Sequence, residues 1–134
     1  MIGDADQTAN CVIELANTPI GFIQFYRWND FPEDVALLEG MTLPDTAWGL
    51  DVFIGDAGAV GRGVGSRAVG VLCSHLEEER GATEILLVTD VTNHRAHRAY
   101  EKVGFATVKE ILDTDTRDGE RVRSYVMRRA GRPA

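Results

Sequence analysis

The chain has 134 residues, the size of one domain with one hydrophobic core. Hydrophobic residues make up 44% and charged residues 26%, which excludes a disordered chain, a collagen-like repeat and a disulfide scaffold. Fourteen Lys and Arg against 21 Asp and Glu give a net charge of -7, so the sequence predicts a soluble globular protein that binds neither nucleic acid nor anionic membranes. We expect residues 1–134 to form a single domain, with 1–10 as a polar leader and 130–134 as a frayed tail.

The predicted elements begin with an antiparallel hairpin. Residues 11–16 and 20–28 are rich in Val, Ile, Phe and Tyr, and the segment between them has turn chemistry. Asp30, Pro32 and Glu33 then form the pattern of an N-cap, a first-turn proline and a capping-box acid, which predicts a short helix ending at Gly40.

A third strand is predicted at residues 47–54, where Asp51 points away from the face that carries Trp48 and Leu50. A glycine-rich loop at 55–63 leads into an amphipathic helix, and the apolar segment 84–89 reads as a buried parallel strand. Together these segments predict one right-handed crossover.

A second helix at 93–103, closed by Gly104, and a hairpin of residues 105–112 and 122–128 complete the chain. The predicted order is ββ(α)βαβαββ. This order describes an α/β protein with a mixed, mostly antiparallel sheet, a central parallel pair and helices packed on the sheet.

Two features of composition bear on location and ligand. Cys11 and Cys73 are predicted to be reduced, packed side chains, and without a signal peptide or a membrane-spanning run the chain is expected in the cytoplasm. Residues 29–60 hold seven acids and no Lys or Arg. This run is either a solvated face or the source of a field that attracts a cationic ligand, and both interpretations stay open.

The glycine-rich loop is the first candidate site. Gly61, Gly63 and Gly65 alternate just before a helix, so backbone N–H groups could face an anion at the positive end of that helix. The spacing fits neither the dinucleotide fingerprint nor a Walker loop. Taken alone, it could also be a plain connection.

A second motif runs from Thr92 to Phe105, as Thr-Asn-His-Arg-Ala-His-Arg-Ala-Tyr-Glu-Lys-Val-Gly-Phe. With the glycine loop it resembles the GNAT superfamily of N-acetyltransferases, over about residues 11–129. The segment 49–55, Thr89-Asp90, the Arg-Ala-x-Arg-Ala-Tyr-Glu-Lys run and Asp118-Gly119 look like its aminoglycoside 6'-N-acetyltransferase branch. The resemblance implies a GNAT-type fold and acetyl transfer from acetyl-CoA, as co-substrate, to a small-molecule amine acceptor.

The resemblance also implies roles for particular residues. Asp51 would accept a proton from the attacking amine or position it, and Tyr100 would protonate the leaving thiolate. Asp51, Asp90 and Asp118 would face a cationic acceptor. The residues implied in acetyl-CoA binding are Val52, Phe53 and Ile54 beside the pantetheine, Gly61, Arg62, Gly63, Val64, Gly65 and Ser66 around the pyrophosphate, and Asn93 on the pantetheine arm.

The chain departs from the family pattern in two ways. Val60 occupies a loop position that is usually Gln or Arg, and the family's first strand and two following helices have no counterpart, so the fold is expected to be truncated at its N-terminus. Such a truncation would bare a sheet edge and an apolar face, which predicts a homodimer or a swapped N-terminal hairpin.

Alternatives to this function remain. The acceptor could instead be a protein N-terminus, a polyamine or a siderophore precursor, or the domain could be an inactive acetyl-CoA-binding module. No metal is expected, because His94 and His97 have no third ligand at a matching spacing.

Overall fold

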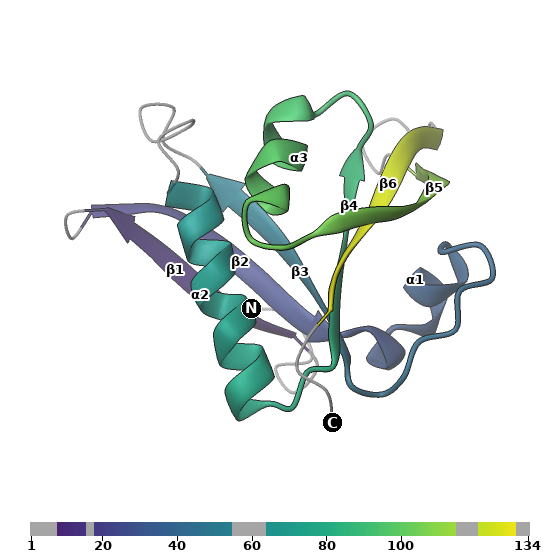
Figure 1. Ribbon diagram of the computed structural model, residues 1–134, viewed down its shortest axis with the longest axis horizontal. Coiled ribbons are helices and arrows are strands. Elements are labelled where there is room, and N and C mark those ends of the chain that lie inside the picture. The colour runs from purple at the N-terminus through teal and green to yellow at the C-terminus, as the bar shows by residue number, and fades with distance from the viewer. Residues whose placement is uncertain (1–7, 16–17, 55–63, 115–120, 131–134) are drawn as a thin grey trace.

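The computed structural model describes residues 8–15, 18–54, 64–114 and 121–130. Its strands form one six-stranded sheet in the order β1-β2-β3-β4-β6-β5 (Figure 1). Adjacent strands are antiparallel except for the parallel pair β3 and β4. The elements are β1 (Thr8–Leu15), β2 (Thr18–Arg27), the 3-10 turn η1 (Trp28–Asp30), α1 (Pro32–Ala36), β3 (Ala47–Ile54), α2 (Val64–Glu79), β4 (Glu84–Asp90), α3 (His94–Glu101), β5 (Ala106–Thr114) and β6 (Arg121–Ala130). The predicted fold class and element order are confirmed.

Apolar side chains are buried on both faces of the sheet. On one face, α2 and α3 cover a core that includes Trp48, Leu50 and Leu76. On the other face, the segment around α1 covers a second core that includes Trp28 and Leu38. Both tryptophans are buried.

Strand β4 shows why both faces need cover. Ile85 and Leu87 belong to the core under α2, whereas Leu86, between them, belongs to the core under α1. All three side chains are at most 2% exposed. The prediction of a strand buried on both faces is therefore confirmed, because alternate residues point to opposite sides of the sheet.

The start of α1 differs from the prediction. Phe31, not Asp30, occupies the N-cap position, and no side chain caps the helix. Asp30 is the last residue of η1, and its carboxylate accepts a hydrogen bond from Arg27 Nε at 3.3 Å. The prediction of Asp30 as the cap is wrong because the 3-10 turn directs its side chain toward the residue three positions earlier.

The two cysteines also differ from each other. Cys73 is buried in the core under α2, as predicted, but Cys11 is exposed on the edge strand β1. Both are free thiols. The prediction that Cys11 is packed is wrong.

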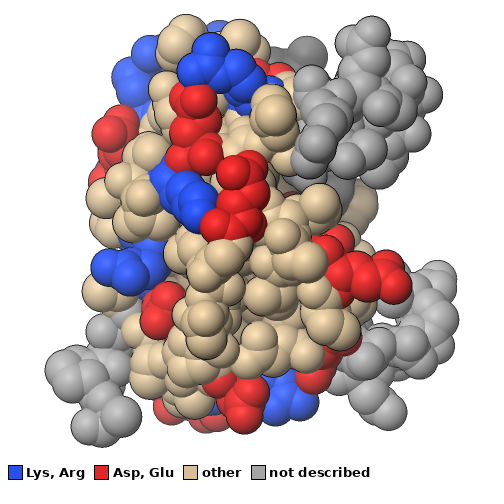
Figure 2. Space-filling model, turned by 90° about the vertical axis from the view of Figure 1, so that its right-hand side faces the viewer, with Lys and Arg blue, Asp and Glu red and all other residues tan. Residues whose placement is uncertain are grey.

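The surface of the described residues carries mixed charge. Figure 2 shows carboxylates and cations interspersed on one face, with no continuous basic patch there. Within the described ranges, no helix combines the length and apolar character needed to cross a membrane.

Candidate active site

Strands β3 and β4 separate part of the way along their length. The parallel ladder joins Ala47 to Glu84, Trp48 to Ile85 and Gly49 to Leu86, and ends there, although both strands continue. Beyond Gly49, β3 keeps its antiparallel partner β2 as far as Ile54. The side of β3 that faces β4 is therefore open over Asp51–Ile54 in the described structure, which leaves backbone groups available to a ligand.

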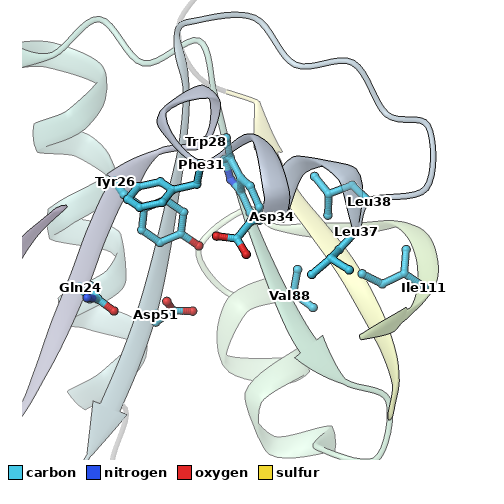
Figure 3. Close-up of a pocket in the computed structure, with 10 residues that line it drawn as sticks. All are labelled: Gln24, Tyr26, Trp28, Phe31, Asp34, Leu37, Leu38, Asp51, Val88 and Ile111. Atoms are coloured by element: carbon cyan, nitrogen blue, oxygen red, sulfur yellow. The ribbon is translucent and has the colours of Figure 1, made fainter. Parts of the chain in front are cut away.

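Asp51 lies at this opening and faces the side of the sheet on which α1 lies. It is directly opposite Gln24 in the register of β2 and β3. Both residues line a cavity of about 370 Å³ between the sheet and α1 (Figure 3). A volume of this size suits a small-molecule ligand.

The lining of this cavity is partly aromatic and partly acidic. It comprises Gln24, Tyr26, Trp28, Phe31, Asp34, Leu37, Leu38, Asp51, Val88 and Ile111. The rings of Tyr26 and Phe31 meet edge to face, with centroids 5.5 Å apart. Two of the lining residues are acids and none is Lys or Arg, so the cavity favours a cation.

Tyr100 approaches the opening from the opposite face of the sheet. It lies on α3, packs against the core under α2 and contacts the Phe105 ring at a centroid distance of 5.9 Å. Burial, together with the smaller effect of the negative charge of Asp51, raises the pKa of Tyr100 to about 12. Asp51 and Tyr100, the two residues that the sequence singled out for chemistry, thus lie within electrostatic reach of each other.

Asn93 and Asp90 lie at the turn between β4 and α3, and both make local contacts. The side-chain oxygen of Asn93 accepts a hydrogen bond from Ala96 N at 3.2 Å, which caps α3. Asp90 Oδ1 accepts from both the backbone N and the hydroxyl of Thr92 at 2.8 Å. These two bonds hold the pKa of the Asp90 carboxyl below its usual value. Both side chains thus fix the start of α3, the helix that carries Tyr100.

The glycine loop is described only from the start of α2. Gly61, Arg62, Gly63 and Asp118 lie outside the described residues, so their predicted roles stay predictions. Val64 and Gly65 form the first turn of α2, and Ser66 is buried at 8% exposure. Figure 1 places this end of α2 next to the end of β3 where the opening lies.

Sequence reasoning missed most of the cavity. Gln24 and Tyr26 alternate with buried Ile23 and Phe25 along β2, so the period of two places them on the same face as Asp51. That alternation is a signal that could have found them. Asp34 gave no comparable signal, because it was one acid among seven in the run 29–60.

The described residues contain no group of three or more His, Cys, Asp or Glu side chains that could hold a metal ion. The rings of His94 and His97 lie 5.9 Å apart, and Nε2 of His97 is 2.9 Å from the carbonyl oxygen of Asp90. His97 also lies against the ring of Tyr125, at 5.1 Å. These contacts account for His97 as part of the packing of α3 on β4 and β6.

Comparison with known proteins gives the following matches. A family model described as an acetyltransferase (GNAT) domain matches residues 2–112. The structure of AAC(6')-Ib in complex with paromomycin and acetyl-CoA is similar at a TM-score of 0.71 and 24% identity, over 92% of this chain and 65% of that chain. AAC(6')-Ib with coenzyme A and kanamycin gives a TM-score of 0.71 at 24% identity, over 92% of this chain and 67% of that one.

A chimera of spermidine N-acetyltransferase SpeG from Vibrio cholerae and hSSAT is similar at a TM-score of 0.72 and 16% identity, over 96% of this chain and 70% of that chain. At these identities the likeness to solved structures shows the fold. This chain spans about 65% of the length of AAC(6')-Ib in the paromomycin complex.

Proposed function

The chain belongs to the GNAT family of acetyltransferases, and from this premise we propose that it transfers the acetyl group of acetyl-CoA to a primary amine of a small cationic acceptor. The observation that carries the proposal is the opening between β3 and β4 beside a cavity lined by Asp51, with Tyr100 within electrostatic reach of Asp51. An aminoglycoside-like amine is the first candidate acceptor and a polyamine the second. We place the protein in the cytoplasm, where free thiols such as Cys11 and Cys73 stay reduced.

The residues at the opening fit acetyl-CoA. When bound, this co-substrate supplies an acetyl thioester on a pantetheine arm that carries amide groups. The open side of β3 at Val52, Phe53 and Ile54 presents backbone donors and acceptors that suit such amides. The first turn of α2, with Val64, Gly65 and Ser66, supplies backbone N–H groups for an anionic phosphate.

Six further residues complete this part of the proposal. Gly61, Arg62 and Gly63 would extend the phosphate site, and the side-chain nitrogen of Asn93 would contact the pantetheine arm. Asp90 and Asp118 would contribute negative charge toward the acceptor. Acetyl-CoA would then enter from the face that carries α2, and the acceptor from the face that carries α1.

Asp51 would bind the amine that reacts. An alkylammonium has a pKa of ~10.4 and an aspartate a pKa of ~3.9, so a carboxylate is a weak base toward it. We therefore assign Asp51 to orienting the amine and passing its proton to water. Most of the acceleration would come from holding the amine nitrogen against the thioester carbon.

Tyr100 would act on the sulfur. Because its pKa is about 12, the phenol keeps its proton at neutral pH and can donate it in a hydrogen bond. As the nitrogen–carbon bond forms and the carbon–sulfur bond breaks, negative charge grows on sulfur, and the Tyr100 O–H would stabilise it. The proton released by the amine leaves to water and balances the reaction.

A panel of amines tests the function. Kanamycin, paromomycin, spermidine and a short peptide with a free N-terminus are each mixed with acetyl-CoA, and free thiol is measured over a constant background from exposed Cys11. We expect thiol release with at least one small cationic amine. Saturable acetyl-CoA binding with no release for any amine would instead favour a regulatory module that binds the co-substrate.

Variants of Tyr100 and Asp51 test the mechanism. Tyr100→Phe should lower kcat by about 10²-fold while acetyl-CoA affinity is unchanged, because only the proton donor is lost. Tyr125→Phe, which removes a phenol from β6, is the matched control. Asp51→Asn should raise KM for the acceptor and spare KM for acetyl-CoA. Unchanged turnover in Tyr100→Phe would remove Tyr100 from the mechanism.

A further inference from the structure

The segment between β2 and β3 forms one wall of the acceptor cavity. Phe31, Asp34 and Leu37, on or next to α1, line the cavity across from Asp51 (Figure 3). Figure 3 shows the carboxylate of Asp34 and the hydroxyl of Tyr26 directed toward each other at the mouth. The position of α1 therefore decides where the second carboxylate of the cavity lies.

One end of this wall is anchored in the core. The indole nitrogen of Trp28 donates a buried hydrogen bond to the carbonyl oxygen of Leu86 on β4, at 3.2 Å. Trp28 itself is only 3% exposed. This anchor precedes α1 and fixes the start of the segment.

The other end is held by Glu39. Its carboxylate accepts a hydrogen bond from the backbone N of Leu112 on the edge strand β5, at 3.0 Å. Its carbonyl oxygen accepts a second bond from Lys109 Nζ on the same strand. We refer to these two bonds as the Glu39 contact.

The backbone conformation of Glu39 is consistent with a residue that is held in place by its contact with β5. Its φ is 54°, in the left-handed region that residues with a side chain rarely adopt, and it is the one non-glycine residue there in the described chain. A backbone in this region persists where surrounding contacts impose it. Both bonds of the Glu39 contact join it to a strand more than 60 positions away in the sequence.

Glu39 and Asp34 are joined by a short segment, residues 34–39, in which successive backbone hydrogen bonds follow one another. Leu37 N donates to Asp34 O at 3.1 Å, Leu38 N to Val35 O at 3.0 Å, and Glu39 N to Ala36 O at 3.3 Å. These successive turns leave little freedom between the two residues. Fixing Glu39 to β5 thus fixes Asp34 at the cavity.

The negative charge of the cavity lining indicates that Asp34 would bind a positively charged group. Asp34 and Asp51 are its two acids, and its lining has no Lys or Arg. The reacting amine binds Asp51 as an ammonium before it loses its proton, so by itself it balances only one of the two carboxylates. An acceptor with a second ammonium group would balance the remaining charge.

We propose that Glu39 is a positioning residue for acceptor choice: by tying the end of α1 to β5, it holds Asp34 where Asp34 binds a second positive charge of the acceptor. This proposal rests on the proposed function and deepens it. The contact uses a side-chain oxygen and a backbone oxygen, so it does not depend on the charge of Glu39.

The test compares two amines that differ by one ammonium group, 1,3-diaminopropane and propylamine. The preference is the ratio of their kcat/KM values. We expect the wild type to prefer the diamine, and both Asp34→Asn and Glu39→Ala to reduce that preference roughly fivefold, as for a partly solvated ion pair. Glu39→Gln should keep the preference because its side-chain oxygen still accepts from Leu112 N.

Two controls separate positioning from general destabilisation. Glu33→Gln alters an exposed acid on the same helix and should leave the preference unchanged. The double variant Asp34→Asn/Glu39→Ala should lose no more than either single variant, because Glu39 acts through Asp34. Hydrogen exchange at the Leu112 amide should be faster in Glu39→Ala and normal in Glu39→Gln.

The outcomes are distinguishable from those for the proposed function. If Glu39→Ala keeps the wild-type preference, or Glu39→Gln loses it, the proposal is wrong. If the wild type acetylates neither amine, transfer to these amines fails, and binding of 1,3-diaminopropane is then followed through the fluorescence of Trp28 in the cavity wall. Weaker binding in Glu39→Ala than in Glu39→Gln would uphold the role of Glu39, and equal binding would overturn it.

Discussion

The carboxylate of Asp51 acts electrostatically on the phenol of Tyr100, although the two side chains belong to opposite faces of the sheet. The ladder between β3 and β4 ends at Gly49 and Leu86, before it reaches Asp51. No backbone pairing separates the two residues beyond that point. The charge of Asp51 on one face of the sheet thus acts on Tyr100 on the other face, next to the unpaired part of β3 and β4.

Alkaline pH should destabilise the protein through two weakly acidic side chains, the buried Cys73 and the partly buried Tyr100. Burial raises the pKa of Tyr100 from 10.0 to about 12 and that of Cys73 from 9.0 to about 12. Between these values the unfolded chain loses protons that the folded chain keeps, so stability falls as pH rises from 9 toward 12. Each group would contribute a slope of about 1.4 kcal/mol per pH unit in its window.

Denaturant unfolding at several pH values measures this slope. Well below pH 9 both groups keep their protons in the folded and the unfolded state, and stability should not depend on them. Cys73→Ala should flatten the curve between pH 9 and 10, where Cys73 alone contributes, and Tyr100→Phe should flatten it above pH 10. A slope unaltered in both variants would contradict the assignment.

Gly49→Ala should disturb the acceptor cavity. A Cβ at this position would lie 2.6 Å from Tyr26 Cε2 and 2.7 Å from Trp28 Nε1, so both rings would have to move. We expect a loss of about 2 kcal/mol in stability, the cost of overpacking, and a changed near-ultraviolet circular dichroism spectrum.

Gly40→Ala serves as the comparison, because a Cβ at Gly40 would meet nothing within 4 Å. Its φ of 96° makes the substitution costly through the backbone alone. The aromatic spectrum of this variant should match the wild type. If Gly49→Ala leaves the aromatic spectrum unaltered, the close approach of Gly49 to the two rings is wrong.

Arg129→Ala should be strongly destabilising. The guanidinium of Arg129 forms two bonds to Glu77, at 3.0 and 3.1 Å, and a third to the carbonyl oxygen of Val103 at 3.2 Å. The side chain of Glu77 is only 8% exposed, so removing Arg129 leaves a buried carboxylate without its partner. The expected loss is about 3 kcal/mol.

The pair of Arg123 and Glu110 provides the matched control for that experiment. Its atoms approach to 2.7 Å, but the side chains are 66% and 40% exposed. Arg123→Ala should cost less than about 1 kcal/mol because solvent screens the pair. Equal losses for the two variants in thermal or denaturant unfolding would show that burial of the Arg129 pair has no energetic effect.

The homodimer stays a prediction, and the structure shows where to test it. The edge strand β5 carries Lys109, Glu110 and an irregular register, features that discourage pairing with another chain, whereas β1 has no charge from Ala9 to Ile13. Val12 on β1 is 65% exposed. Pairing of β1 with β1 of a second copy across a two-fold axis would cover this edge.

Light scattering at micromolar concentration measures the oligomeric state. We expect a dimer in the wild type and a monomer in Val12→Lys, with Val108→Lys on the opposite edge still dimeric. A wild-type monomer would contradict the prediction.

The predictability of the fold and of the site differs for a physical reason. Strand β2 followed from its Ile, Phe and Tyr content and the turn before it, β3 from apolar alternation, and β4 from an unbroken apolar run, all of which are local in sequence. The cavity depends on contacts such as Glu39 with Leu112, 73 positions apart, and on the register that sets Gln24 opposite Asp51. Contacts of this kind are fixed by packing, and composition does not report them.

The acidic run at 29–60 illustrates the same difference. The acids of this run have different contacts in the structure. Asp30 pairs with Arg27, Asp45 accepts a hydrogen bond from Asn29, and Glu39 accepts one from β5. Asp34 and Asp51 line the cavity. Three of these acids therefore make contacts within the protein and two line a cavity, and the attraction of a cationic ligand stays a prediction. Only the three-dimensional arrangement divides them.

The early end of the β3–β4 ladder also has a kinetic consequence for the proposed reaction. Two reactants that reach the site along separate routes on opposite faces of the sheet do not block one another's path. Neither has to depart before the other can bind, so initial velocities should follow a random sequential scheme, with intersecting double-reciprocal lines and no ping-pong pattern.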